Sequence, residues 1–184
     1  MFMKESKVLA FSTALLVLFA GAALYALSVG QEVSSLQITD ANGKPAAIPF
    51  IGSKVVSIFY NDADAADIND QLADAIKAKK FPEAKYKGMG IANLADSKAP
   101  NFVIRKVIQG KIKKYNTTIL TDSERKVAKL WGLGDCNNTS VFILIGVDKK
   151  VKYVKKGAIR GEEITTIINP VSYTHLTLPT KRIV

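Results

Sequence analysis

The sequence predicts an α/β domain built on one mixed β-sheet with flanking helices. Three observations support this fold class. Strands and helices alternate through the middle of the chain, a hairpin is predicted near the N-terminal end of this region, and an antiparallel pair of strands closes it. The 184 residues are 48% hydrophobic and 23% charged, which suits one globular domain with an additional hydrophobic segment.

The first half of the domain is predicted from turn chemistry and helical periodicity. Leu36–Thr39 alternates like a strand, and the following Asp40–Gly43 contains Asn-Gly, which tolerates positive φ in a tight turn. After a loop, Lys54–Tyr60 (KVVSIFY) is rich in β-branched and aromatic residues, as expected of a strand covered on both faces. A helix is predicted over Ala65–Lys79, with Asp62 or Asp64 as its N-terminal cap.

The second half of the domain continues the alternation. We expect a strand at Tyr86–Asn93, a helix over Asn101–Tyr115, a strand at Thr117–Thr121, a short helix ending at Trp131, strands at Ser140–Ile145 and Val151–Lys155, and a last helix from Gly161 to about Ile168. This order of elements is that of the thioredoxin-like fold in its extended form, which begins with a hairpin.

The chain also resembles one family within that fold, the YtfJ-type family of exported bacterial proteins. The resemblance covers about Gln31–Asn169 and rests on an ordered series of short matches: Ala78–Tyr86, Ile91–Asn93, Trp131, Thr139–Val141, Asp148–Lys149, Lys155–Ala158 and Glu162–Glu163. It implies a thioredoxin-like domain outside the cytoplasm, and it implies no particular activity.

Two positions depart from redox-active members of the fold. The turn after the first central strand, which carries the reactive cysteine or Cys-x-x-Cys pair in those proteins, reads Asn61-Asp62-Ala63-Asp64 and contains no sulfur. Redox members also carry a cis-proline just before the strand that begins here at Ser140. Because a non-proline cis bond costs roughly 3–4 kcal/mol, the groove at this end of the sheet is expected to differ in backbone shape.

These departures predict a groove that binds a protein or a small ligand without catalysis. Its expected lining residues are Asn61, Asp62, Asp64, Asn137, Thr139 and Ser140. The alternative is a single-thiol peroxidase or thiol exchanger that uses Cys136, the only cysteine, in the loop before Ser140. Its sequence neighbours offer no positive charge to stabilise a thiolate, so an unreactive loop or core thiol is the simpler interpretation.

A second, remoter alternative is an aspartate-based phosphatase. Asp62 and Asp64 have the spacing of the Asp-x-Asp motif in haloacid-dehalogenase phosphatases, but no later acidic pair for Mg²⁺ is evident. The same run fails as a calcium loop, because Asp67 stands where glycine is required. We therefore expect no metal and no cofactor.

The two ends of the chain are predicted to lie outside the domain, which we place at residues 31–170. Residues 1–30 combine an N-terminal Lys4 and Lys7 with an apolar run, the pattern of a secretory signal, with cleavage expected after Gly30 or Ala22. Retention of the run as a membrane anchor is the alternative. Residues 171–184 resemble translated sequencing adapter and include His175, the only histidine, so no native histidine is expected for acid–base work.

The net charge and the type of basic residue indicate which classes of partner the protein can bind. The formal net charge is +10, and the excess is nearly all lysine, since the domain holds only Arg105, Arg125 and Arg160. Lysines do not form the bidentate forks that read phosphates and bases, and no stripe of arginine and aromatic residues is present, so nucleic acid is excluded as a partner. We expect an exported, periplasmic protein with an unidentified protein or small-ligand partner, and at most weak contact with an anionic membrane surface.

Overall fold

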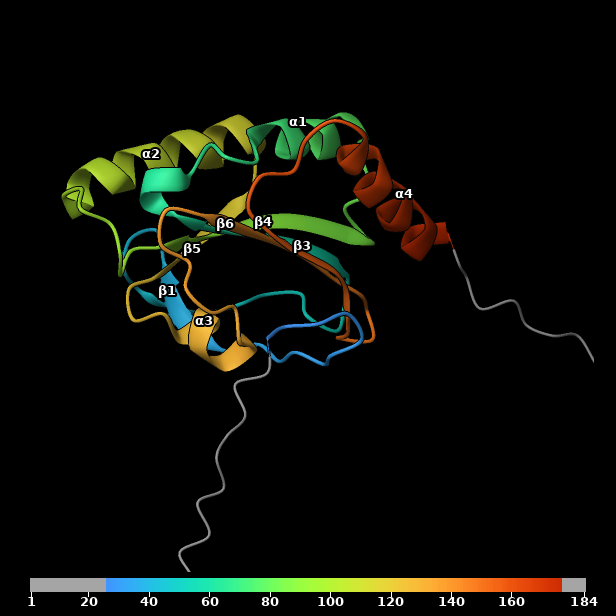
Figure 1. The fold of residues 1–184 in the computed structure, drawn as a ribbon, viewed down its shortest axis with the longest axis horizontal. Helices are drawn as coiled ribbons and strands as arrows, with labels where there is room; N and C mark the ends of the chain where they lie inside the picture. Colours follow the sequence, from blue (N-terminus) through green and yellow to red (C-terminus); the bar gives the residue numbers. More distant parts are fainter. Residues whose placement is uncertain (1–25, 177–184) are drawn as a thin grey trace, which may run out of the picture.

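The computed structural model describes residues 26–176 as a seven-stranded mixed sheet covered on both faces (Figure 1). The sheet order is β2-β1-β5-β4-β3-β6-β7. The strands are β1 (Gln37–Asp40), β2 (Pro45–Ala47), β3 (Val55–Asp62), β4 (Tyr86–Asn93), β5 (Thr118–Asp122), β6 (Ser140–Ile145) and β7 (Val151–Lys156). The helices are α1 (Asp70–Ala78), α2 (Asn101–Tyr115), α3 (Lys126–Trp131) and α4 (Glu162–Leu176), with a short 3₁₀ turn, η1, at Ala63–Ala65.

The centre of the sheet is parallel and its flanks are antiparallel. β3, β4 and β5 run in the same direction, whereas β6 and β7 on one side and β1 and β2 on the other run antiparallel to their neighbours. The register places Asp62 beside Asn93 and Asn93 beside Asp122. The carboxyl ends of the three parallel strands therefore meet at one edge, where open α/β sheets bind their ligands.

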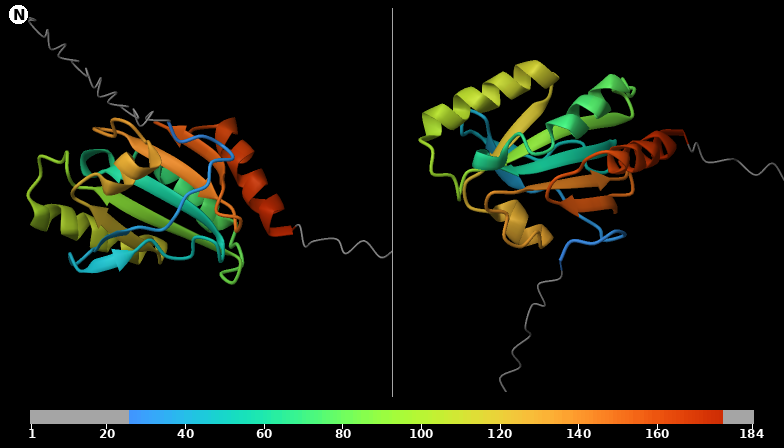
Figure 2. Two further views of the ribbon diagram at one scale, coloured as in Figure 1. Left: turned by 90° about the horizontal axis from the view of Figure 1, so that it is seen from below. Right: turned by 45° about the horizontal axis from the view of Figure 1, so that its top comes forward.

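The helices divide between the two faces. α1, α2 and α4 lie on one face, and α3 lies on the other with the N-terminal segment (Figures 1 and 2). Alternate residues of β3 supply both cores: Val56 and Ile58 pack in the cluster that includes Trp131 of α3, whereas Val55 packs with Leu72 of α1. This two-sided burial explains the nearly continuous apolar run of β3.

Several predicted elements match the structure in full, and two helices differ. The bounds of β4, α2 and β6 are confirmed. The prediction that the helix after β3 begins at Ala65 is wrong, because α1 begins at Asp70 and η1 with a turn fills the interval. The backbone carbonyl of Ala66 accepts hydrogen bonds from Asn61 and Lys111 side chains, which satisfies it without helical pairing.

The last helix is also longer than predicted. α4 continues to Leu176, past Pro170, and not only to Ile168. A proline inside a helix removes one backbone hydrogen bond and bends the helix without having to end it. The adapter-like origin of residues 171–184 stays a prediction, and residues 177–184 lie outside the described residues.

The chain just before the predicted domain boundary packs against the domain. Leu27 is buried and its backbone N–H donates to the Gly132 carbonyl, and the Gly30 N–H donates to the Val151 carbonyl. The predicted signal and its apolar run lie mostly within residues 1–25, outside the described residues. Within residues 26–176, no helix has both the length and the apolar character needed to cross a membrane.

Candidate functional site

Asp62 joins the turn after β3 to the loop before β6. Its side chain is fully buried; Oδ1 accepts the Asp64 backbone N–H at 2.8 Å, and Oδ2 accepts the Asn138 backbone N–H at 3.0 Å. Its own N–H donates to the Thr139 carbonyl at 2.9 Å. The turn after β3, where the sequence lacks the expected sulfur, thus begins at a buried carboxylate whose two oxygens accept hydrogen bonds from the surrounding backbone.

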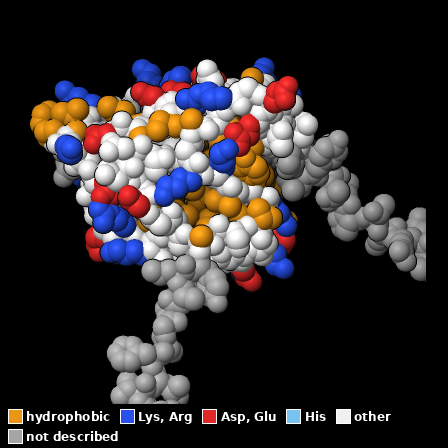
Figure 3. All heavy atoms as spheres, in the orientation of Figure 1, with side chains coloured by type: hydrophobic (Ala, Val, Ile, Leu, Met, Phe, Trp, Pro, Cys, Tyr) orange, Lys and Arg blue, Asp and Glu red, His pale blue; other side chains and the backbone are white. Residues whose placement is uncertain are grey.

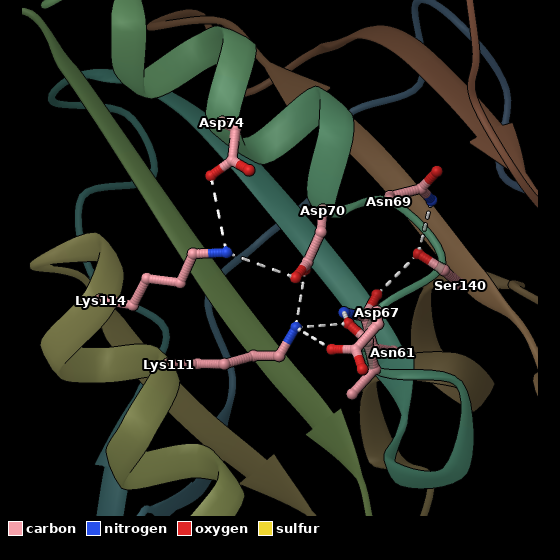
Figure 4. Close-up of polar contacts among 9 residues, drawn as sticks. Asn61, Asp67, Asn69, Asp70, Asp74, Lys111, Lys114 and Ser140 are labelled. Carbon is pink, nitrogen blue, oxygen red and sulfur yellow. Dashed lines mark hydrogen bonds and ion pairs between the residues drawn. The ribbon is translucent and has the colours of Figure 1, made fainter.

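A second buried network lies beside Asp62 (Figure 4). The Ser140 hydroxyl donates to the Asn61 side-chain oxygen at 2.6 Å and accepts from the Asn69 side-chain nitrogen at 2.8 Å. The Asn69 side-chain oxygen accepts the Ile159 N–H at 2.8 Å, and its nitrogen also donates to the Gly157 carbonyl at 3.1 Å. Asn69 thus connects the start of α1 with β6 and with the loop that leads into α4.

The structure brings most of the predicted site residues together. Asn61, Asp62, Thr139 and Ser140 are linked by the bonds above, and all peptide bonds in residues 26–176 are trans, including the one before Ser140. Asp64 is exposed and accepts from the Ser97 hydroxyl at 3.2 Å. Asn137 is also exposed, and its N–H donates to Asp135 rather than to the β3 turn.

Cys136 lies in the core and not at a reactive surface. Its side chain is 3% exposed and packs in the same cluster as Trp131 and Val141. Burial raises the pKa of the thiol, and the nearby Lys156 ammonium opposes this effect without overcoming it; Asp135, Asp96 and Asp62 raise the pKa further. A thiol that is buried and protonated at neutral pH is a poor nucleophile, which disfavours the single-thiol enzyme.

The aspartate arrangement also disfavours the phosphatase alternative. A nucleophilic carboxylate must present a free oxygen to the substrate, whereas both Asp62 oxygens are bonded to backbone within the core. Among residues 26–176, no group of three or more His, Cys, Asp or Glu side chains is placed to hold a metal ion.

Sequence reasoning missed the polar row at the carboxyl ends of the parallel strands. Asn93 and Asp122 are as buried as Asp62, their neighbour in the row. Asp122 accepts the Lys126 and Val127 backbone N–H groups, each at 2.8 Å, and the Tyr60 hydroxyl at 3.2 Å. These two backbone bonds cap the start of α3.

Tyr60 and the ion pair of Asp96 with Arg125 each keep one protonation state near neutral pH. Burial and then the negative charge of Asp122 raise the pKa of the Tyr60 hydroxyl, so it stays protonated and donates. Hydrogen bonds from Arg125 and then Asn93 lower the pKa of Asp96, which forms an ion pair with Arg125. None of these groups is poised to exchange a proton near neutral pH.

A pair of lysines from α2 bridges to α1 (Figure 4). The Lys111 ammonium lies 2.7 Å from carboxylate oxygens of both Asp67 and Asp70, and the Lys114 ammonium lies 3.6 Å from Asp70 and 3.7 Å from Asp74. Burial by itself lowers the pKa of Lys111, but the hydrogen bonds and charges of Asp67 and Asp70 outweigh it, so the pKa is raised. Lys111 therefore stays charged and holds α1 to α2.

We predict that Lys111→Met lowers the free energy of unfolding by about 1–2 kcal/mol at pH 7, because two carboxylates lose a half-buried partner. Since the folded pKa of Lys111 is raised above its ordinary value of 10.5, its contribution is fully present below that pH and is lost as the pH rises through the folded pKa. The difference between wild type and variant, measured by denaturant unfolding, should stay constant up to about pH 10 and shrink only above pH 10.5. Lys113→Met is the control: it removes an exposed lysine of the same helix that has no ion pair within residues 26–176, and should lower the free energy of unfolding by less than about 0.5 kcal/mol.

Two adjoining cavities lie between α1 and α2 on this face of the sheet. The smaller, about 110 Å³, is lined at one end by Asn61, Asp62 and Asp64 and on the α2 side by Val103 and Val107. The larger, about 220 Å³, continues along β4 toward the end of α1, and Lys111 lines both. We call the two together the α1–α2 groove. Part of the predicted lining is thus present, although Asn137, Thr139, Ser140 and Cys136 line neither cavity.

The face seen in Figure 3 does not carry a single basic surface. Lys and Arg side chains are interspersed with Asp and Glu across it, and hydrophobic side chains gather at the start of α2, where Phe102 is 65% exposed. Isolated lysines among acids attract anionic surfaces only weakly, and contact with a membrane surface stays a prediction.

Fold and site together define a thioredoxin-like domain whose active-site turn has no redox centre. The thioredoxin domain of a thiol-disulfide oxidoreductase from Bacteroides vulgatus superposes with a TM-score of 0.57, covering 79% of this chain and 99% of that one at 12% identity. This likeness shows the fold alone. The family model described as "Bacterial protein of unknown function (YtfJ_HI0045)" matches residues 50–174, and the chain belongs to this family.

Two relatives agree with this membership. A protein of Haemophilus influenzae is 30% identical over 121 residues, which are 65% of each chain. The YtfJ protein of Escherichia coli is 24% identical over 177 residues, covering 89% of this chain and 94% of that protein. The match therefore spans slightly less than two thirds of the Haemophilus influenzae relative and nearly all of the Escherichia coli relative.

Proposed function

We propose that this protein is an exported, non-catalytic binding protein that uses a thioredoxin-like scaffold without thiol chemistry. The observation that carries the proposal is the buried bonding of Asp62, whose oxygens accept two backbone N–H groups in a turn that contains no cysteine. The neighbouring Asn61–Ser140–Asn69 network fixes the same edge of the sheet. A preformed concave site remains beside it in the α1–α2 groove, and such grooves are the usual sites of small ligands.

The competing function is single-thiol redox chemistry at Cys136. It is tested by measuring consumption of hydrogen peroxide and of glutathione disulfide by the wild-type protein and by Cys136→Ser, with a thiol reductant supplied. The binding proposal expects no turnover above the buffer rate in either protein. Turnover by the wild type that disappears in Cys136→Ser would instead establish the enzyme.

Export is proposed from the basic start and apolar run before the domain. The packing of Leu27 and Gly30 adds a constraint, because cleavage after Gly30 would remove a buried side chain and three backbone hydrogen bonds, two of them to the rest of the domain. Cleavage after Ala22 would keep them. We predict that the protein recovered from the periplasmic fraction of a bacterial host begins upstream of Leu27, as read by intact mass.

The same measurement distinguishes the other possibilities for the N-terminal segment. A full-length chain in the membrane fraction would indicate that the apolar run is retained as an anchor, and recovery in the cytoplasmic fraction would contradict export. A mature chain that begins at Gln31 would show that the Leu27 contacts are dispensable. An engineered chain that begins at Gln31 should then unfold at the same temperature as one that begins at Ala23.

A further inference from the structure

The α1–α2 groove exists because β4 has no side chains where its neighbours do. Tyr86 faces the helical layer and packs with Leu72 and Ile76, whereas Met89 and Ile91 pack on the opposite face of the sheet. By the alternation of a strand, Gly88 and Gly90 face the helices with Tyr86. Both line the larger cavity, and neither has the positive φ that would require glycine. A Cβ at Gly88 would lie 3.3 Å from the Tyr86 hydroxyl and one at Gly90 would lie 3.2 Å from Ile119, so a side chain at either position would crowd these neighbours and take up room in the cavity.

The larger cavity has apolar walls against the sheet and α1, and polar or charged side chains line the rest of it. Phe59 and Ile119 from the sheet and Ala73 and Ile76 from α1 line it. The Ser57 and Tyr86 hydroxyls are hydrogen-bonded to each other at 2.5 Å, so neither needs a hydrogen bond from a ligand. The Tyr115 hydroxyl, from the end of α2, is buried and makes no hydrogen bond of good geometry among the described residues; burial raises its pKa, and its interaction with the Lys114 ammonium opposes that shift. A buried donor of this kind is costly unless a ligand or water meets it.

The charge along the cavity is mainly positive where it reaches the end of α1. Lys77 and Lys80 line it there, and neither has an acidic partner within residues 26–176. The Lys77 ammonium donates to the Lys114 carbonyl and lies 5.8 Å from the Tyr115 ring centre. Asp70 is already neutralised by Lys111, which leaves Glu83 as the lining carboxylate without an ion pair in the described part of the chain.

We propose that the α1–α2 groove binds an anionic amphiphile, an alkyl or aryl group that carries one carboxylate or sulfonate. The apolar part lies over Gly88 and Gly90 between the helices, and the anionic group lies toward Lys77 and Lys80 with Tyr115 as a hydrogen-bond donor. This inference rests on the proposed binding function and names its ligand class. Burial of the apolar part supplies most of the affinity, and the lysines select the sign of charge.

The test uses anilinonaphthalene sulfonate as a fluorescent probe and decanoate as its competitor. The wild-type protein should bind the probe in a saturable manner, and decanoate should displace it at lower concentration than decanol or decyltrimethylammonium does. Ala73→Leu fills the cavity from α1 with a good helix former and should weaken binding roughly tenfold or more. Ala78→Leu makes the same change at an exposed position of α1 outside the cavity and should leave binding unchanged.

Charge selection is tested separately at the end of α1. Lys80→Glu should weaken decanoate roughly three- to tenfold and leave decanol unchanged, whereas Lys79→Glu, an exposed neighbour outside the cavity, should change neither. Thermal unfolding of each variant confirms that it is folded.

The outcomes separate the ligand class from the function. If decanoate and decyltrimethylammonium displaced the probe equally well, and Ala73→Leu weakened the binding of both, the ligand would not be selected by its negative charge. The groove would still be a binding site. Absence of saturable binding, or binding that Ala73→Leu does not weaken, would overturn the site. Neither result would affect the redox test. Only turnover that depends on Cys136 in that test would replace the proposed binding function with catalysis.

Discussion

Replacing Asn69 by alanine is expected to lower the free energy of unfolding by about 3 kcal/mol, because Asn69 and two of its partners, Ser140 and Ile159, are buried away from water. The variant leaves the Ile159 N–H and the Gly157 carbonyl without their bonds and removes one of the two bonds of the Ser140 hydroxyl. Each orphaned buried group typically costs about 1–3 kcal/mol. Denaturant unfolding monitored by circular dichroism measures the difference.

A matched control for Asn69 is Asn137→Ala. Asn137 is exposed, and only its backbone N–H takes part in a hydrogen bond shown within residues 26–176, so the change should stay within about 0.5 kcal/mol. Equal, small effects of the two variants would show that the buried Asn69 network does not hold the edge of the sheet.

Replacing Asp122 by alanine is the second large effect, with an expected loss of about 3 kcal/mol. The change orphans the backbone N–H groups of Lys126 and Val127 and leaves the fully buried Tyr60 hydroxyl without its acceptor. Because Asp122 holds the start of α3 against the sheet, tryptophan fluorescence of Trp131 should also change before global unfolding. Trp131 is 2% exposed in that helix.

Asp135→Ala is the corresponding control for Asp122. Asp135 also accepts a backbone N–H, that of Asn137, but it does so in an exposed loop, where water replaces the lost bond. We expect a loss below about 1 kcal/mol. If Asp135→Ala were as harmful as Asp122→Ala, burial would not be the cause of the effect.

The fold could be predicted largely because its strong elements carry local patterns. The apolar run of β6 and the turn chemistry of Asp40–Gly43 needed no distant information, and both match the structure. The start of α1 could not be found in this way, since it depends on the Asn61 and Lys111 side chains that take up the Ala66 carbonyl. Periodicity alone made Ala65–Asp70 look helical.

The candidate site was less predictable than the fold. Some of its residues meet only after folding, because they are distant in sequence, and others are glycines, which have no side chain to reveal a role. Asn69 looks like an ordinary polar residue of a helix, and its role appears only when Gly157 and Ile159 are brought to it. In the sequence, Gly88 and Gly90 indicate only a weaker strand. A pattern search detects residues that are present, whereas the α1–α2 groove is formed by side chains that are absent.

The central claim is that this family member keeps a redox fold whose former active edge is held by buried polar bonds and performs no thiol chemistry. The most direct measurement is the rate at which iodoacetamide alkylates Cys136 at pH 8, followed by mass spectrometry, in the folded protein and in denaturant. Because burial raises the pKa of this thiol, the folded protein is expected to react at least roughly tenfold more slowly than the unfolded chain. A folded protein that reacts as fast as the unfolded chain, or faster, would contradict the account.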